Sequence, residues 1–128
     1  MTATAMTSPQ QILTEVDGLT GPQVDALPFG AIQLDRDGTI LQFNEYEANL
    51  SNRRAPDTIG ANFFRDVAPC TNVREFYGRF QQGIAAGELN VSFDYRFAFK
   101  QAPRDVRVTL FYSTPTGTMW VFVQERSK

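Results

Sequence analysis

The sequence predicts an α+β domain: a five-stranded antiparallel sheet with helices on one face and a helical cap on the other. Three observations predict it. Residues 91–99 alternate between apolar and polar side chains, which is typical of a strand with one buried face. Residues 118–126 are apolar on both faces, which indicates a sheet covered on both sides. Residues 74–86 have helical spacing and can cover one side, so residues 1–28 remain to cover the other.

The N-terminal segment, residues 1–28, is predicted to be a cap that belongs to the same domain as the core, residues 29–128. Ser8 and Pro9 match the N-cap and first position of a helix. Gly18 is expected to stop the first helix, and a second short helical piece ends before Pro28.

The core begins with a predicted hairpin, residues 31–34 and 39–43, joined by an Asp- and Gly-containing turn. Asn44 can cap a short helix, with Glu47 three residues later as in a capping box. The remaining predicted elements are helical turns at 55–60 and 62–67, a helix at 74–86, and strands at 91–99, 106–113 and 118–126.

Composition and charge exclude some classes of function. The 128 residues suffice for one domain, and the net charge of −2 without a basic stripe argues against a nucleic-acid partner. The first 35 residues carry four acidic residues and no basic one, whereas the rest carry 12 basic against 10 acidic residues. This asymmetry suggests that charge helps the cap to dock; the alternative is that both surfaces are simply solvated.

Other functions are disfavoured by what the chain lacks. A secretory signal and an apolar run long enough to span a membrane are both missing, so we expect a cytoplasmic protein without a membrane partner. The chain has one Cys and no His, which makes an internal disulfide impossible and a zinc site improbable. A cysteine nucleophile with a histidine base is also excluded, and we therefore expect no enzyme activity.

One segment is far more specific than the rest. Residues 66–71 (Asp-Val-Ala-Pro-Cys-Thr), followed by residues 75–78 (Glu-Phe-Tyr-Gly), resemble the chromophore-attachment segment of the photoactive yellow protein family. The resemblance runs from about residue 27 to 103 and resumes at 120–123. It also covers residues 29–35, 40–42, 59–60 and 62–64, which match in order and spacing.

The resemblance implies a PAS fold and a trans 4-hydroxycinnamic acid (p-coumaric acid) bound as a thioester to the cysteine sulfur. In this family a glutamic acid and a tyrosine hold the phenolic oxygen ionised in a buried pocket. Light isomerises the double bond, the glutamic acid protonates the phenolate, and the N-terminal cap loosens to signal.

The resemblance also assigns roles to residues. Cys70 matches the attachment cysteine, Glu47 the proton donor and Arg53 the arginine at the pocket mouth; Ser51 replaces a threonine and keeps the hydroxyl. The turn before a helix should leave backbone N–H groups free to favour the Cys70 thiolate, and burial should raise the pKa of Glu47. The pocket-wall positions are Phe43, Phe63, Val67, Ala68, Tyr95, Phe97, Phe99 and Gln101.

Each role has an ordinary structural alternative. Cys70 alone would be read as a buried thiol that packs as a small hydrophobe. Glu47 could complete the capping box, and Arg53 could be surface charge. The wall residues could simply fill the core, although that is compatible with lining a pocket.

Besides Ser51, the chain departs from the family at three positions. Phe43 stands where the family has the tyrosine that donates to the phenolate. A hydrogen bond to a charged group contributes about 1.5–3 kcal/mol, so its loss should raise the pKa of the phenol by roughly one to two units. Ser51 could replace that donor. Gln101 replaces a methionine and Phe99 a tyrosine in the same wall, and both changes could alter the thermal return to the dark state.

The sequence therefore predicts a monomeric blue-light photoreceptor that passes its signal to another, unknown protein. A second hypothesis is a chromophore-free PAS-like module that binds a small ligand or a protein. A third, a cysteine acyl-transfer enzyme, lacks the usual histidine base.

Overall fold

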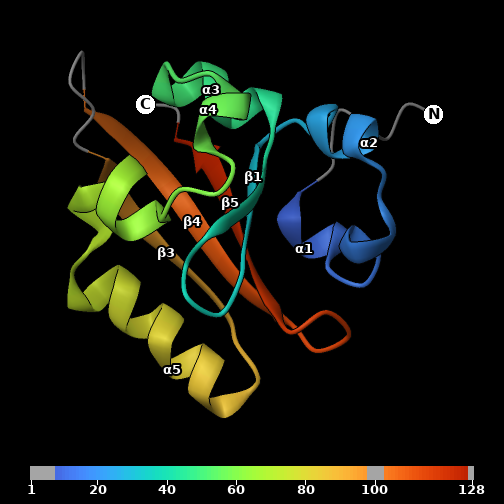
Figure 1. The fold of residues 1–128 in the computed structure, drawn as a ribbon, viewed down its shortest axis with the longest axis vertical. Helices are drawn as coiled ribbons and strands as arrows, with labels where there is room; N and C mark the ends of the chain where they lie inside the picture. Colours follow the sequence, from blue (N-terminus) through green and yellow to red (C-terminus); the bar gives the residue numbers. More distant parts are fainter. Residues whose placement is uncertain (1–7, 98–102, 127–128) are drawn as a thin grey trace.

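The sheet forms the centre of the domain. The computed structural model describes residues 8–97 and 103–126 (Figure 1). The five antiparallel strands stand in the order β2-β1-β5-β4-β3, which confirms the predicted sheet. Their bounds are β1 Gly30–Leu34, β2 Ile40–Phe43, β3 Asn90–Phe97, β4 Arg104–Ser113 and β5 Thr118–Glu125.

Short helices between β2 and β3 cover one face of the sheet (Figure 1). They are α3 Glu45–Ser51, α4 Ala55–Thr58, the π-helical turn η3 Phe63–Val67, the 3-10 turn η4 Pro69–Thr71, the π-helical turn η5 Arg74–Gly78 and α5 Arg79–Ala86. The helix predicted over residues 74–86 thus begins as a π-helical turn. It ends before Gly87, whose φ of 73° suits a residue without a side chain.

The cap consists of α1 Pro9–Ile12, the 3-10 turn η2 Val16–Gly18 and α2 Gly21–Asp25. Ser8 is the N-cap of α1, as the sequence predicts, and its backbone N–H donates to the Gln11 side chain. Helix α2 begins at Thr20 with a capping box. Figure 1 shows the cap beside the sheet. Its α2 lies next to the start of α3, where the Asp25 side chain accepts a hydrogen bond from the Glu45 backbone N–H.

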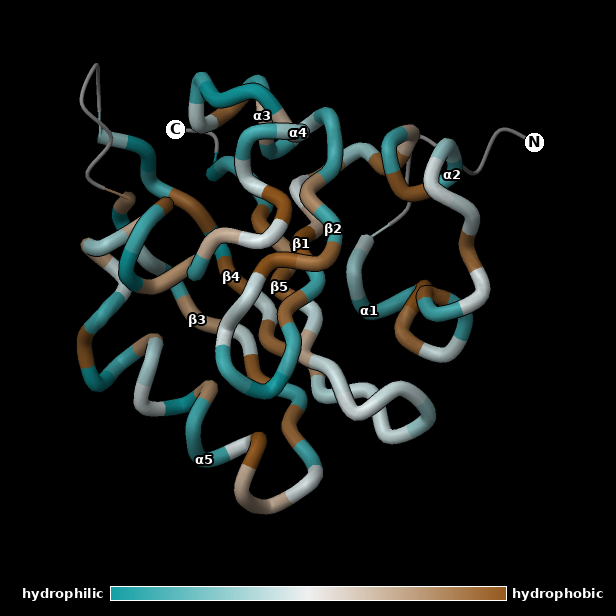
Figure 2. The backbone as a smooth tube through the Cα atoms, viewed as in Figure 1, coloured by the Kyte–Doolittle hydropathy of each residue, from teal (hydrophilic) through white to brown (hydrophobic). Residues whose placement is uncertain are grey.

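Alternate residues of β5 belong to two separate apolar clusters. Met119, Val121 and Val123 pack in the main cluster under the helices, whereas Trp120 and Phe122 pack against the cap. All five are fully buried. Figure 2 shows the resulting apolar centre of the sheet. This arrangement explains why both faces of the last strand are apolar, and it confirms that the N-terminal segment covers the second face.

The contacts of the cap are apolar contacts and hydrogen bonds. Ile12, Val16 and Val24 meet the two β5 aromatics. All six ion pairs of residues 8–97 and 103–126 lie between residues 54 and 126, so none holds the cap. The prediction that charge helps the cap to dock therefore finds no ion pair to support it. No helix in this described part is long and apolar enough to cross a membrane.

Candidate functional site

A buried carboxyl group marks the site. Glu47 lies in the first turn of α3 with 2% of its surface exposed. Its Oε1 is the one buried side-chain nitrogen or oxygen atom in the described part of the chain without a hydrogen-bond partner. Burial raises the pKa of Glu47 to about 8, in the direction that the sequence predicts. At neutral pH this carboxyl group is therefore mostly protonated and can act as a hydrogen-bond donor.

The capping-box interpretation of Glu47 is wrong. Asn44 is the N-cap of α3, and its Oδ1 accepts a hydrogen bond from the Glu47 backbone N–H at 3.1 Å. The reciprocal bond is missing because the Asn44 backbone N–H donates to the carbonyl of Ala31, in the sheet. The Glu47 carboxyl group therefore makes no hydrogen bond to the N-cap backbone, and it lies in the protein interior.

Gly30 makes room for this carboxyl group. A Cβ added at Gly30 would overlap Glu47 Oε1 and would lie 3.3 Å from Glu47 Cβ and 3.2 Å from Val123 Cβ. The sequence analysis missed this residue, although a glycine in a strand often marks a close approach of another group.

The lone cysteine lies in the turn η4 and is half-buried. The Tyr95 hydroxyl donates a hydrogen bond to the carbonyl of Cys70 at 2.5 Å, which fixes the turn against β3. The backbone N–H groups of Thr71 and Asn72 donate to carbonyls within the turn. These two donors are therefore not free, contrary to the expectation for the turn.

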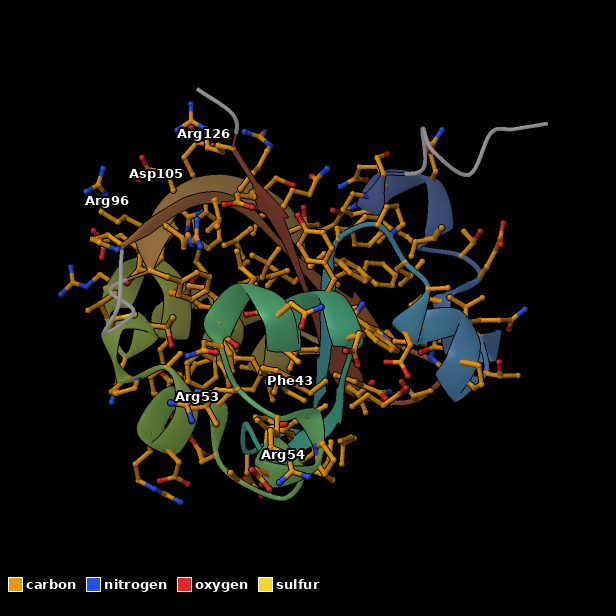
Figure 3. All side chains as sticks on the ribbon, turned by 90° about the horizontal axis from the view of Figure 1, so that it is seen from above. Phe43, Arg53, Arg54, Arg96, Asp105 and Arg126 are labelled. Carbon is orange, nitrogen blue, oxygen red and sulfur yellow. The ribbon has the colours of Figure 1, made fainter. Side chains whose placement is uncertain are left out.

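The two polar residues at the end of α3 bond to backbone carbonyls. Arg53 is exposed, and its Nη2 donates to the carbonyl of Val67 at 2.8 Å (Figure 3). This bond joins the end of α3 to η3. The Ser51 hydroxyl donates to the carbonyl of Glu47, one turn earlier, at 2.7 Å. Its single hydrogen is therefore already engaged within the helix.

The predicted wall residues meet in the main apolar cluster. Phe43, Phe63, Val67, Ala68 and Phe97 are all buried there, and Tyr95 is half-buried against them. Phe99 and Gln101 lie outside the described residues.

Phe76 lies at the centre of this aromatic group. Its ring centroid is 5.4 Å from that of Tyr95 and 5.9 Å from that of Phe63. The sequence analysis placed Phe76 in the predicted helix 74–86 and in the matching segment 75–78, but it gave this residue no role in the pocket wall. The pairing of its helix with β3 is a long-range contact that spacing along the chain does not reveal.

The site is thus built from several elements that pack on one side of the sheet. Glu47 comes from α3, Cys70 from the turn before η5 and Tyr95 from β3. Cys70 and Tyr95 both pack against the main apolar cluster. In the described residues no cluster of acidic, cysteine or histidine side chains could hold a metal ion. The arrangement offers one thiol, one neutral acid and an aromatic environment.

Comparison with known proteins gives a consistent picture. The PAS fold family matches residues 23–124. Photoactive yellow protein from Rhodothalassium salexigens is 47% identical over 102 residues, which are 80% of this chain and 82% of that protein. Photoactive yellow protein from Cereibacter sphaeroides is 44% identical over 103 residues, with the same coverage of both chains.

A solved structure agrees in three dimensions. The photoactive yellow protein domain of the sensor histidine kinase Ppr from Rhodospirillum centenum is similar with a TM-score of 0.84 and 42% identity. The match covers 88% of this chain and 99% of that domain. The buried acid, the single cysteine and these likenesses lead to one conclusion: the chain belongs to the photoactive yellow protein family of PAS-fold proteins.

Proposed function

We propose that this protein is a blue-light photoreceptor that carries 4-hydroxycinnamic acid as a thioester on Cys70. The observation that carries the proposal is the Glu47 carboxyl group, which is buried and mostly neutral, with an oxygen that lacks a partner. A neutral buried acid is suited to donate a hydrogen bond to a phenolate. When bound, the chromophore supplies a double bond that light isomerises and an ionised phenolic oxygen.

The residues of the site would each hold or shield this group. The Cys70 sulfur would form the thioester, while the bond from Tyr95 to the Cys70 carbonyl keeps the turn in place. Arg53, bonded to the Val67 carbonyl, would close the entrance between α3 and η3. The buried aromatic residues around Phe76 would exclude water.

In the dark, Glu47 would hold its proton and donate a hydrogen bond. After illumination Glu47 would give this proton to the phenolic oxygen, which leaves a carboxylate inside the protein. An unpaired buried charge is costly, so the packing around α3 would rearrange to hydrate it.

Asn44 connects this helix to the cap. Its Nδ2 donates to the carbonyls of Val24 in α2 and Phe29, at 2.9 and 3.0 Å, while its Oδ1 accepts from Ala31 and Glu47. A displacement of α3 would strain these bonds. We therefore include release of the cap, residues 1–28, in the proposal, with a separate protein as receiver of the signal.

Infrared difference spectroscopy tests the proton transfer. Illumination of the reconstituted protein should remove a protonated-carboxyl band, and a Glu47→Gln variant should lack this change. A wild-type carboxyl band that is unaffected by light, or one that persists in the variant, would rule Glu47 out as the donor.

Hydrogen exchange tests the release of the cap separately. Amides of residues 8–28 should exchange faster in the light than in the dark, while those of the central strand β5 should stay protected. Equal protection of the cap in both states would refute its release and leave the chromophore assignment intact.

A further inference from the structure

An open groove lies where the cap meets the edge of the sheet, away from Cys70. Its volume is about 410 Å³, within the range of ligand sites. The lining comes from α2 of the cap, the edge strand β2, the start of α3 and α4. Val24 and Phe43, both buried, are among the lining residues.

Exposed apolar side chains gather at this groove. In the described part of the chain three large hydrophobic residues are exposed, and two of them, Leu41 at 42% and Ile59 at 49%, line it. The third, Val73, lies elsewhere. Single exposed hydrophobic residues need no explanation, but two that share one concave surface indicate a contact site.

The charge of the lining is one-sided. Asp25 and Glu45 are exposed and carry carboxylates, and no Lys or Arg lines the groove. Asp25 is fixed in place because its Oδ1 accepts a hydrogen bond from the Glu45 backbone N–H at 3.1 Å. The first 35 residues contain no basic residue to offset these charges. The nearby Arg54 is paired with Asp57 on α4.

We infer that this groove binds a segment of a partner protein in which apolar side chains alternate with Lys or Arg. The apolar side chains would cover Leu41 and Ile59, and the basic ones would face Asp25 and Glu45. An extended segment suits an elongated surface of this kind, because its side chains can reach the apolar and the acidic parts of the lining in turn. A pocket for a small ligand usually buries most of the surface of that ligand. The walls of this groove are too exposed to bury a small ligand in that way.

The inference goes beyond the proposed function and does not depend on it. One consequence links the two: because α2 forms a wall, release of the cap would take the groove apart. If the proposed photocycle is correct, light should weaken binding of the segment. Binding in the dark tests the groove alone. Failure of the groove inference can therefore be distinguished from failure of the proposed photocycle.

A peptide titration followed by ¹H–¹⁵N NMR tests the groove. The probe is an acetylated, amidated heptapeptide of alternating leucine and lysine, with a leucine–glutamate heptapeptide as its counterpart. The lysine peptide should shift the amide signals of Val24, Leu41 and Ile59 in the dark, and the glutamate peptide should bind roughly tenfold more weakly.

Surface variants provide matched controls. Leu41→Ser with Ile59→Ser should weaken binding about tenfold or more, whereas Val73→Ser, at the exposed hydrophobic residue outside the groove, should not. Asp25→Asn with Glu45→Gln should weaken it several-fold while keeping the Asp25 acceptor, and Glu88→Gln should have no effect. The inference is overturned if the lysine peptide at millimolar concentration shifts no groove signal, if both peptides bind equally, or if Val73→Ser is as damaging as the groove variant.

Discussion

The carboxylate of Asp17 accepts a hydrogen bond from the indole Nε1–H of Trp120 at 3.0 Å and so ties the cap to the central strand of the sheet. The same carboxylate accepts a hydrogen bond from the Ser113 hydroxyl. Trp120 is fully buried, so its N–H is left without this protein partner if the bond is lost.

Removal of this acceptor should loosen the cap. We expect Asp17→Ala to lower the free energy of unfolding by about 1–3 kcal/mol, because a buried donor is left without a partner. Urea unfolding followed by the fluorescence of the single tryptophan measures this loss. The exposed Glu15 is the control, and its change to Ala should cost no more than about 0.5 kcal/mol. Equal losses in the two variants would show that the bond contributes nothing specific.

A methyl group at position 30 should disturb Glu47. Gly30→Ala places a Cβ on the Glu47 carboxyl oxygen, and overpacking of this kind costs about 1–3 kcal/mol. Gly18→Ala is the control, because a Cβ there meets nothing within 4 Å. In a Gly30→Ala/Glu47→Ala double variant the two losses should not add, since the second change removes the clash. Strict additivity in denaturant unfolding would contradict this contact.

The buried Glu47 should make stability depend on pH in a defined direction. Its pKa is raised by burial from 4.5 to about 8, so between these values the folded state binds more protons than the unfolded state. In the chromophore-free protein, the contribution of Glu47 to the free energy of unfolding is therefore fully present below about pH 4.5. This contribution is lost as the pH rises towards 8, at about 1.4 kcal/mol per pH unit.

Comparison with Glu47→Gln isolates this contribution. The difference in unfolding free energy between wild type and variant should fall steadily as pH rises from about 5 to 7, because glutamine does not titrate. Urea unfolding at several pH values measures it. Parallel pH profiles for the two proteins would mean that Glu47 is not the group responsible.

Phe43 offers a test of how the phenol of the proposed chromophore would be ionised. Phe43 is buried, and Ser51 already donates its hydroxyl hydrogen to the Glu47 carbonyl. A Phe43→Tyr change should add a donor and lower the pKa of the bound phenol by roughly one to two units. A pH titration of the dark visible spectrum of both reconstituted proteins measures this shift. An unchanged titration midpoint would show that residue 43 does not reach the phenol.

The sheet, the cap and the order of elements could be predicted because each depends on local patterns. The alternation along β3 and the two apolar faces of β5 identify both segments as strands. The helices between β2 and β3 can cover one face of the sheet, so only the N-terminal segment remains to cover the other. Cys70 and Glu47 were found through a resemblance of motif. The spacing of Asn44 and Glu47 alone favoured a capping box.

Other features were not predicted from the sequence, mainly because they depend on long-range contacts. The Asn44 backbone N–H donates to the carbonyl of Ala31 in β1, and this leaves the Glu47 carboxyl group free to enter the core. The tie between Asp17 and Trp120 spans 103 positions of the chain. Helical spacing could not show that residues 74–86 begin with a π-helical turn, because the local pattern of apolar residues is similar for both.

The most direct test of the account is reconstitution of the purified protein with the activated anhydride of 4-hydroxycinnamic acid. We predict a visible absorption band that bleaches after a blue flash and returns in the dark, and that a Cys70→Ala variant lacks. Wild-type protein without such a band, or a band that survives in Cys70→Ala, would contradict the thioester. A wild type without the band would instead favour a PAS module that binds another ligand.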